Sequence, residues 1–296
     1  MGFQSLEEIA EVCQDRKWNF FEAVLHENME ECTYSRKQSI ETMFTMWKAM
    51  QEAEENYEGN LYSKSGLVGG DGEKMDVYRT SGQSYGGEFI GMVMSAALKT
   101  AESNACMKRI VAAPTAGACG VLPAVLLSCK KLKQWSDMDF VESLYVAAGI
   151  GEVIATRAFI AGAAGGCQAE IGSAAAMAAG ALIYLKGGST EQIMHGVAMA
   201  LKNLMGLVCD PVAGLVEVPC VKRNVIGAMC AVSSADMALA GIESKIPADQ
   251  VIDAMRQVGE SMDVKLKETG LGGVAASSRG RKVAEELYKG KNSQKG

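Results

Sequence analysis

The 296-residue chain lacks several features that would place it at once in a class of protein. It has no uninterrupted apolar run of the roughly 18 residues that a membrane-spanning helix needs, because Glu152, Arg157, Glu170 and Lys186 interrupt its apolar segments. The N-terminus, MGFQSLEEIAEVC, has no basic segment followed by an apolar one, which argues against export. We therefore expect a cytoplasmic protein.

Long basic blocks and aromatic residues are also scarce. The net charge is −6 and Lys and Arg occur only in short groups, so a nucleic-acid-binding surface is not expected. Aromatic residues make up 6% of the chain, whereas Ala, Gly and Met are abundant. This composition favours closely packed helices over a β-sandwich. With 48% apolar residues, a chain of this length can bury a sizeable core.

Apolar residues recur at the helical period through most of the chain. We expect helices at about residues 6–13 and 39–55, and again at 88–104. The glycine-rich residues 61–87 are typical of a loop that could line a site. The segment VAAPTAGACGVLPAVL predicts a turn that leads into a helix near residue 121.

Helix starts later in the chain have recognisable signals. Ser136 with Asp139, and Ser189 with Gln192, resemble capping boxes, and Pro247 suits the first turn of a helix. The sequence thus predicts a mainly α protein, a compact all-helical domain with Gly/Pro-rich loops. We expect an N-terminal helical segment at residues 1–58 packed on a main domain at 59–285, and a polar, fraying tail at 286–296.

The nine cysteines are not expected to form disulfides in a reducing compartment. Three of them adjoin Gly, Pro or a turn: Cys167 in GGCQAE, Cys209 in GLVCDPVAG and Cys220 in VEVPC. Five lie in ordinary helical or apolar contexts and are expected in the core, namely Cys13, Cys32, Cys106, Cys129 and Cys230.

No tight C-x-x-C pair is present, which disfavours a zinc finger or a ferredoxin-type site. Three thiolates without an obvious fourth ligand would suit a 4Fe–4S cluster that has one open iron and acts as a Lewis acid. Spacing alone leaves buried structural thiols as the alternative.

Five segments in order resemble the iron–sulfur-dependent L-serine dehydratases (L-serine ammonia-lyases), specifically the α chain of the two-chain bacterial form. They are SGLVGGDGEKM, NACMKRIVAAPTAGACGVLPAVL, AGGCQAEIGSAAAMAAGAL, NLMGLVCDPVAGLVEVPCVKRN and KETGLGGVA, spanning about residues 60–275. The resemblance implies a 4Fe–4S cluster held by Cys167, Cys209 and Cys220, whose separations of 42 and 11 residues fit the family pattern. Residues 59–285 would then be a catalytic domain around a buried iron–sulfur site.

The chemistry implied by the resemblance is β-elimination of L-serine to pyruvate and ammonia without pyridoxal phosphate (PLP). The cluster would act as a Lewis acid on the C3 hydroxyl. The turn formed by Thr115, Ala116, Gly117 and Ala118 resembles the loop that binds the substrate carboxylate, and backbone amides at a helix start suit an anion. A tight structural turn is the alternative.

Further candidate site residues flank the cysteines. Gln168 is a candidate for substrate binding and Glu170 for catalysis, with structural support of the site as the alternative for both. Asp210 and Asn224 invite a similar interpretation with less weight. Lys267, in KETGLGG, resembles a family motif and is a second catalytic candidate, although a surface lysine is the alternative.

The chain contains only two histidines, His26 and His195, and both are predicted to be solvated. In the family that the sequence resembles, a Ser-rich segment with a histidine supplies active-site groups, and in the two-chain form it belongs to the β chain. We find no such segment here, so the resemblance implies a β-chain partner that contributes the base and a regulatory domain. Single-chain relatives tend to end in a cysteine, whereas this chain ends NSQKG.

Two other functions are weighed against this hypothesis. A PLP-dependent hydroxy-amino-acid dehydratase would need a Schiff-base lysine and a phosphate-binding Gly loop in alternating β/α units, and the helical periodicity disfavours it. A non-catalytic helical scaffold for a partner chain is the other alternative.

Overall fold

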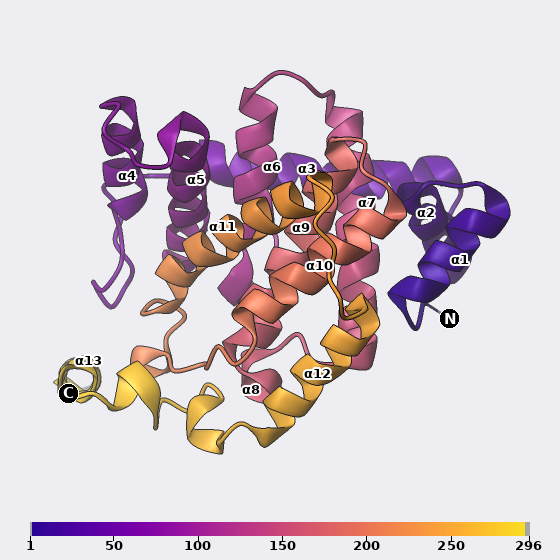
Figure 1. Ribbon diagram of the computed structural model, residues 1–296. Helices are drawn as coiled ribbons and strands as arrows, with labels where there is room; N and C mark the ends of the chain where they lie inside the picture. Colours follow the sequence, from indigo (N-terminus) through magenta and orange to yellow (C-terminus); the bar gives the residue numbers. More distant parts are fainter. Residues whose placement is uncertain (1, 294–296) are drawn as a thin grey trace.

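Helices make up most of the computed structural model, which describes residues 2–293 (Figure 1). Within that range there is no β-strand, and one isolated parallel bridge joins Cys209 to Lys267. The prediction of a mainly α, all-helical protein is confirmed. These residues do not form the alternating β/α units that the PLP alternative requires.

The α-helices are α1 Leu6–Arg16, α2 Phe20–Cys32, α3 Arg36–Glu55, α4 Asp71–Thr80, α5 Gly87–Ala105, α6 Val121–Lys131, α7 Asp137–Arg157, α8 Gly162–Gly165, α9 Ser173–Leu185, α10 Thr190–Leu204, α11 Cys220–Leu239, α12 Ala248–Ser261 and α13 Ser278–Ser293. Short helical turns lie between them: η1 Ala116–Ala118, the π-helical η2 Gln168–Gly172, η3 Val212–Gly214, η4 Val264–Leu266 and η5 Gly273–Ala276.

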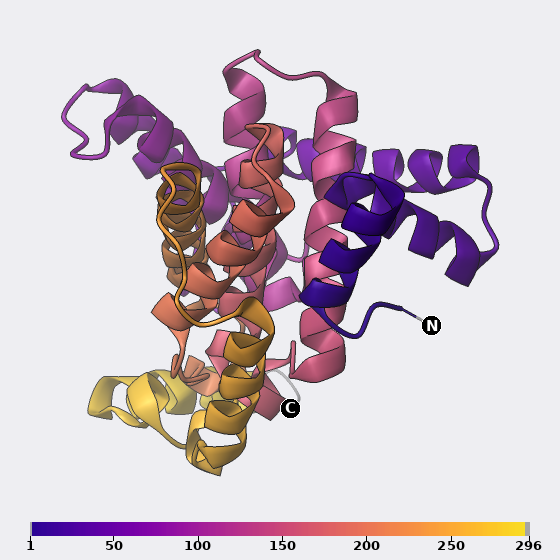
Figure 2. The ribbon, with the colours of Figure 1, turned by 45° about the vertical axis from the view of Figure 1, so that its right-hand side comes forward.

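Helix α9 is the centre of the bundle and packs against α6, α7, α10 and α11 (Figures 1 and 2). Its sequence is mostly Ala and Gly, so neighbouring backbones come close. A Cβ added to Gly180 would lie 2.2 Å from Cδ1 of Ile150 in α7, and one on Gly196 of α10 would lie 2.3 Å from Cδ1 of Ile183. The small residues are therefore required by the packing of this helix.

Local capping signals fix several helix starts as predicted. Both capping boxes, at Ser136 and at Ser189, are formed, and Pro247 immediately precedes α12. A third box, between Ser35 and Gln38, starts α3 three residues before the predicted position. Each box satisfies backbone N–H groups that have no partner within the helix.

The prediction of a loop throughout residues 61–87 is wrong, because α4 lies within it. Gly70 precedes this helix and provides no side-chain cap. The cap comes instead from Glu102 of α5, a buried carboxylate that accepts hydrogen bonds from the backbone N–H of Asp71 (2.9 Å) and Gly72 (3.1 Å). A cap from a distant segment leaves no signal in the local sequence.

The N-terminal helices pack on the bundle through contacts of α2 and α3 with α7 (Figure 2). At the other end, α13 packs against η3 and η5 and continues to Ser293, so the predicted tail boundary at residue 286 falls inside a helix. Residues 294–296 of the predicted tail lie outside the described residues. The division into segments at residues 58 and 285 stays a prediction. None of the described helices is long and apolar enough to cross a lipid bilayer.

The five cysteines predicted in the core are not all buried. Cys13 and Cys129 are buried, whereas Cys106 and Cys230 are half-buried. The prediction is wrong for Cys32, which is exposed because it ends α2 at the surface, just before the chain turns at Thr33.

Candidate active site

Three thiols from distant segments lie near the N-terminal ends of α9 and α11. Cys167 immediately precedes η2, Cys209 lies in the connection after α10, and Cys220 is the first residue of α11; all three are buried, free thiols. Burial, with Cys167 and Glu170 nearby, raises the pKa of Cys220 to about 12. Burial also raises the pKa of Cys209, and Cys167, Glu170 and Cys220 add to that shift. The three sulfurs therefore lie within electrostatic reach of one another.

Arg223 links the three cysteine segments. It lies one helical turn after Cys220, and its Nη1 donates to the carbonyl oxygen of Val208 at 2.8 Å. Its Nη2 forms an ion pair with Oδ1 of Asp210 at 2.9 Å. Burial raises the pKa of Cys167 to about 11, and the adjacent Arg223 opposes this increase. The site thus contains one largely buried guanidinium among three thiols.

The segment KETGLGGVA lies beside Cys209. The Cys209 N–H donates to the carbonyl of Leu266 (2.8 Å), and the Glu268 N–H donates to the carbonyl of Cys209 (2.7 Å), on either side of Lys267. Further along, the Val274 N–H donates to Oδ2 of Asp210 at 2.7 Å. The structure therefore brings Lys267 to the site through its backbone.

Gln168 is fully buried, and its amide binds backbone groups. Its Nε2 donates to the carbonyl of Met255 (3.0 Å), and its Oε1 accepts from the N–H of Gly206 (2.7 Å). Its own N–H donates to the carbonyl of Leu207 at 2.9 Å. These bonds hold the Cys167 turn against the segment that leads to Cys209. Substrate binding by Gln168 stays a prediction, while its contacts are those of a residue that supports the site.

Glu170 connects the cysteines with the predicted carboxylate loop. The hydroxyl of Thr115 donates to Glu170 Oε1 at 2.7 Å. Burial raises the pKa of Glu170; the Thr115 hydrogen bond opposes the shift and Glu268 adds to it. A Cβ on Gly162 would lie 2.8 Å from Sγ of Cys209 and 2.9 Å from Oε2 of Glu170, so the thiol and the carboxylate border the same glycine.

The predicted loop itself is held from several sides. Residues Ala116–Ala118 form η1, and Gly117 leaves little room for a side chain, since its Cβ would lie 3.0 Å from Oε1 of Glu170. Asn104, at the end of α5, donates from Nδ2 to the carbonyl of Ala116 at 3.1 Å. The sequence did not indicate Asn104 or Arg223 as site residues. The spacing of Arg223 three residues after Cys220 on one helix was the available signal.

Neither histidine belongs to this site. His26 stacks on Trp18, with ring centroids 4.2 Å apart. His195 is more buried than predicted, because its Nδ1 accepts from the Ser244 N–H at 3.3 Å and its side chain is 23% exposed. It lies nine residues before the end of α10 at Leu204, about 14 Å along the helix. The described site has no imidazole.

The described residues form no site for a single metal ion. Within residues 2–293, no three His, Cys, Asp or Glu side chains are gathered closely enough to hold one metal ion. Ligands of one ion share bonds of about 2.3 Å to the same atom, whereas thiolates around an iron–sulfur cluster bind different irons and stand farther apart. Cys167, Cys209 and Cys220, three buried thiols, are of the residue type that holds such a cluster.

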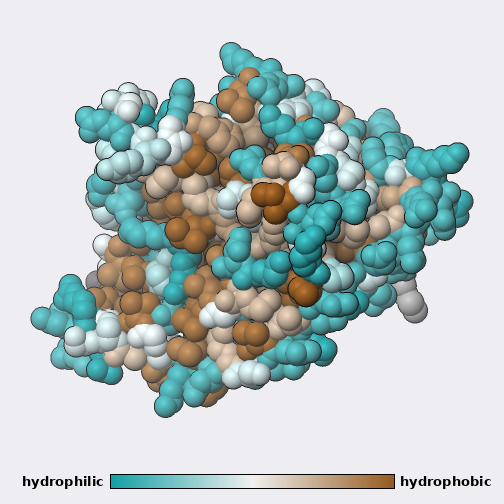
Figure 3. All heavy atoms as spheres, in the orientation of Figure 1, coloured by the Kyte–Doolittle hydropathy of each residue, from teal (hydrophilic) through white to brown (hydrophobic). Residues whose placement is uncertain are grey.

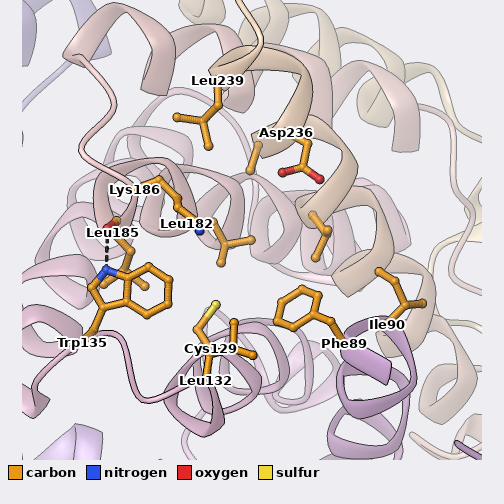
Figure 4. Close-up of a pocket in the computed structure, with 12 residues that line it drawn as sticks. Phe89, Ile90, Cys129, Leu132, Trp135, Leu182, Leu185, Lys186, Asp236 and Leu239 are labelled. Carbon is orange, nitrogen blue, oxygen red and sulfur yellow. Dashed lines mark hydrogen bonds between the residues drawn. The ribbon is translucent and has the colours of Figure 1, made fainter. Parts of the chain in front are cut away.

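A separate apolar pocket of about 330 Å³ lies away from the thiols (Figure 4). Phe89, Trp135, Leu182 and Leu239 line it, with the charged Lys186 and Asp236. Its residues from α11 begin at Val232, about 18 Å along that helix from Cys220. None of the predicted site residues lines this pocket.

The family described as Serine dehydratase alpha chain matches residues 15–275 of the sequence. The chain belongs to this family. It is 42% identical to the probable L-serine dehydratase, alpha chain, of Bacillus subtilis over 97% of its own length and 96% of that protein. It is 40% identical to the L-serine dehydratase, alpha chain, of Peptoniphilus asaccharolyticus over 95% of this chain and 97% of that one.

Longer relatives carry a name without a chain designation. The L-serine dehydratase of Helicobacter pylori is 36% identical over 92% of this chain, but the match covers only 61% of that protein. The resemblance seen in the sequence is thus confirmed at the level of the family. The relatives include alpha chains matched along nearly their whole length and longer proteins that have additional sequence.

Proposed function

We propose that this chain is the catalytic α chain of an L-serine dehydratase, which converts L-serine to pyruvate and ammonia with a 4Fe–4S cluster held by Cys167, Cys209 and Cys220. The convergence of these three buried thiols, from segments 42 and 11 residues apart, is the observation that carries the proposal. The similarity to proteins named as L-serine dehydratase alpha chains supports the substrate and the reaction.

When bound, the cluster supplies Lewis-acid chemistry at the substrate hydroxyl. The chain must present thiolates to it, although burial raises the pKa of all three thiols. Arg223 provides a compensating positive charge beside Cys167, and Asp210 holds the guanidinium in place. We assign to Arg223 the role of stabilising the thiolate form of the ligands.

The substrate would be oriented by the loop from Thr115 to Ala118. Backbone N–H groups at this turn suit the serine carboxylate. Glu170, held by Thr115, borders both the loop and Cys209, and it would contact the substrate or exchange a proton with it. Lys267, beside Cys209, is the second catalytic candidate. Gln168 would affect substrate binding mainly indirectly, by supporting the Cys167 turn.

A second chain would complete the site. Removal of the Cα proton requires a base, and neither histidine of this chain lies there. The name alpha chain in the relatives indicates a further subunit, and the longer relatives have sequence beyond the match. Apolar surface gathers over the loop between α10 and α11, above the C-terminal segment (Figure 3). Exposed apolar residues of α11 and of the segment between α12 and α13 include Ile226, Val264, Leu271 and Val274.

The proposal is tested by producing the chain anaerobically with and without its β chain and measuring pyruvate formation from L-serine, with L-threonine as a second substrate. We expect activity only from the pair, and loss of both activity and iron in Cys209→Ser. Cys129→Ser, which removes a buried thiol away from the site, is the matched control. Full activity of the isolated chain would contradict the role of the partner, and an active Cys209→Ser pair would favour the scaffold alternative.

A further inference from the structure

Asn224 occupies a position between the predicted carboxylate loop and Cys220. Its side chain is 1% exposed. Its Oδ1 accepts a hydrogen bond from the Gly120 N–H at 2.8 Å, and its Nδ2 donates to the carbonyls of Gly117 (2.9 Å) and Cys220 (3.0 Å). Both amide hydrogens and the amide oxygen are therefore used by backbone groups.

Asn224 lies on the same face of α11 as Cys220. Cys220, Arg223, Asn224 and Gly227 follow one another at the spacing of a single helix face. Gly227 lets this face approach closely, since a Cβ there would lie 2.8 Å from Cγ2 of Ile171. The same face thus presents a thiol, a guanidinium and an amide.

Other hydrogen bonds hold the loop without involving the backbone of Cys220. Asn104 binds the carbonyl of Ala116, and Thr115 binds Glu170. Only Asn224, among the contacts described here, binds the loop and the backbone of a predicted cluster ligand with one side chain. Because the Asn224 amide is planar and all its hydrogen-bonding atoms have partners, a shift of the loop or of the Cys220 backbone would break at least one of these hydrogen bonds.

We infer that Asn224 is a positioning residue that fixes the substrate-carboxylate loop relative to Cys220. The expected effect of Asn224 on catalysis rests on the proposed function. The coupling of the two segments is a property of the chain itself and does not depend on that function. An aspartate at this position would keep an acceptor for the Gly120 N–H. It would also set a carboxylate against the Gly117 and Cys220 carbonyls, which need donors.

Hydrogen exchange tests the coupling on the full chain without cofactor. Asn224→Asp should speed exchange in peptides covering residues 115–122 and 218–224 together, by on the order of tenfold. Asn104→Ala should affect the first peptide alone, and Asn60→Asp, at an exposed asparagine, neither. A peptide from α7 in the same samples serves as the internal reference. If Asn224→Asp also unfolds α7, the same comparison on Asn224→Gln decides.

The complete, cluster-loaded pair gives the second measurement. Asn224→Asp should raise KM for L-serine and lower the iron retained after gel filtration, whereas Asn104→Ala should raise KM alone. Exchange that changes in only one of the two peptides, or in neither, would overturn the inference. A wild-type pair that binds no iron and forms no pyruvate would instead overturn the proposed function, while leaving the exchange result as evidence on Asn224.

Discussion

The hydroxyl of Thr115 donates a 2.7 Å hydrogen bond to the carboxylate of Glu170, although the two residues are 55 positions apart in the sequence. This bond joins the loop predicted to bind the substrate carboxylate to the segment that begins with Cys167. It places a half-buried acid, with a pKa raised by burial, at the edge of the thiol site. Two predictions follow from this pair.

Replacing Glu170 with glutamine keeps the size of the side chain and removes its charge and its proton exchange. If Glu170 serves in acid–base catalysis, kcat should fall by roughly 10²- to 10⁴-fold. The iron content should stay at the wild-type level, since Glu170 is not a proposed ligand. Steady-state kinetics and iron analysis on the same preparation check this, with Glu191→Gln, at an exposed position of α10, as control. Unchanged kcat would remove Glu170 from the catalytic groups.

Thr115→Val keeps the branched shape and removes the hydroxyl, so Glu170 loses its donor and the loop loses an anchor. We expect KM for L-serine to rise on the order of tenfold. Thr115→Ser keeps the hydroxyl and should stay close to wild type. The ratio of the two KM values is the measurement, and equal values for Val and Ser would show that the hydroxyl has no part in substrate binding.

The C-terminal segment is predicted to support the cysteine site through Gly273. This residue has a φ of +57°, and a Cβ there would lie 2.2 Å from Oδ2 of Asp210. Gly273→Ala should therefore displace Asp210 and Val274, destabilise the fold by about 1–3 kcal/mol beyond backbone strain, and lower iron retention.

Gly241→Ala separates the two effects. Gly241 has a φ of +84°, with no atom within 4 Å of an added Cβ. The Gly241→Ala variant should lose only about 1 kcal/mol of its free energy of unfolding, from backbone strain, and should keep a normal iron content. Urea unfolding and iron analysis of both variants provide the comparison. Equal behaviour of the two would mean that contact with Asp210 is unimportant.

Acid should weaken the attachment of α4 to α5. Burial alone would raise the pKa of Asp76, but hydrogen bonds from Arg79 (2.7 Å) and Lys99 (3.0 Å) lower it to about 2. A carboxyl whose pKa is lower in the folded state stabilises the fold above its unfolded pKa, near 4, and loses this effect as the pH falls toward 2.

Asp76→Asn should therefore be less stable than wild type at pH 7, by on the order of 1 kcal/mol because the pair is partly exposed. The difference should shrink at pH 3. Urea unfolding at the two pH values measures it, with Asp15→Asn, an exposed aspartate, as control. A difference that does not depend on pH would assign the effect to packing.

Local rules account for the parts of the fold that the sequence predicted. Ser136 and Ser189 cap their own helices, so their signals lie within four residues. Helix α4 was missed because its cap, Glu102, comes from another helix. Such tertiary contacts override a glycine-rich composition that by itself is typical of a loop.

The sequence likewise predicted some residues of the candidate site and missed others. Two features of the sequence indicated the three cysteines. Each lies next to a turn, and their separations in the sequence fit the pattern of the family that the chain resembles. Arg223 was missed because a Lys-Arg pair at the start of a helix is typical of a solvated surface. Only the folded chain shows that its guanidinium reaches Val208, Asp210 and Cys167.

Anaerobic iron and sulfide analysis of the wild-type chain and of Cys167→Ser, Cys209→Ser and Cys220→Ser, with Cys129→Ser as control, tests most directly whether the three thiols share one cluster. Wild type and the control should contain iron and sulfide in equal amounts and show broad thiolate-to-iron absorption. Each of the other three variants should lose both. Retention of the full iron and sulfide content by any one of these three would contradict a cluster shared by the three thiols.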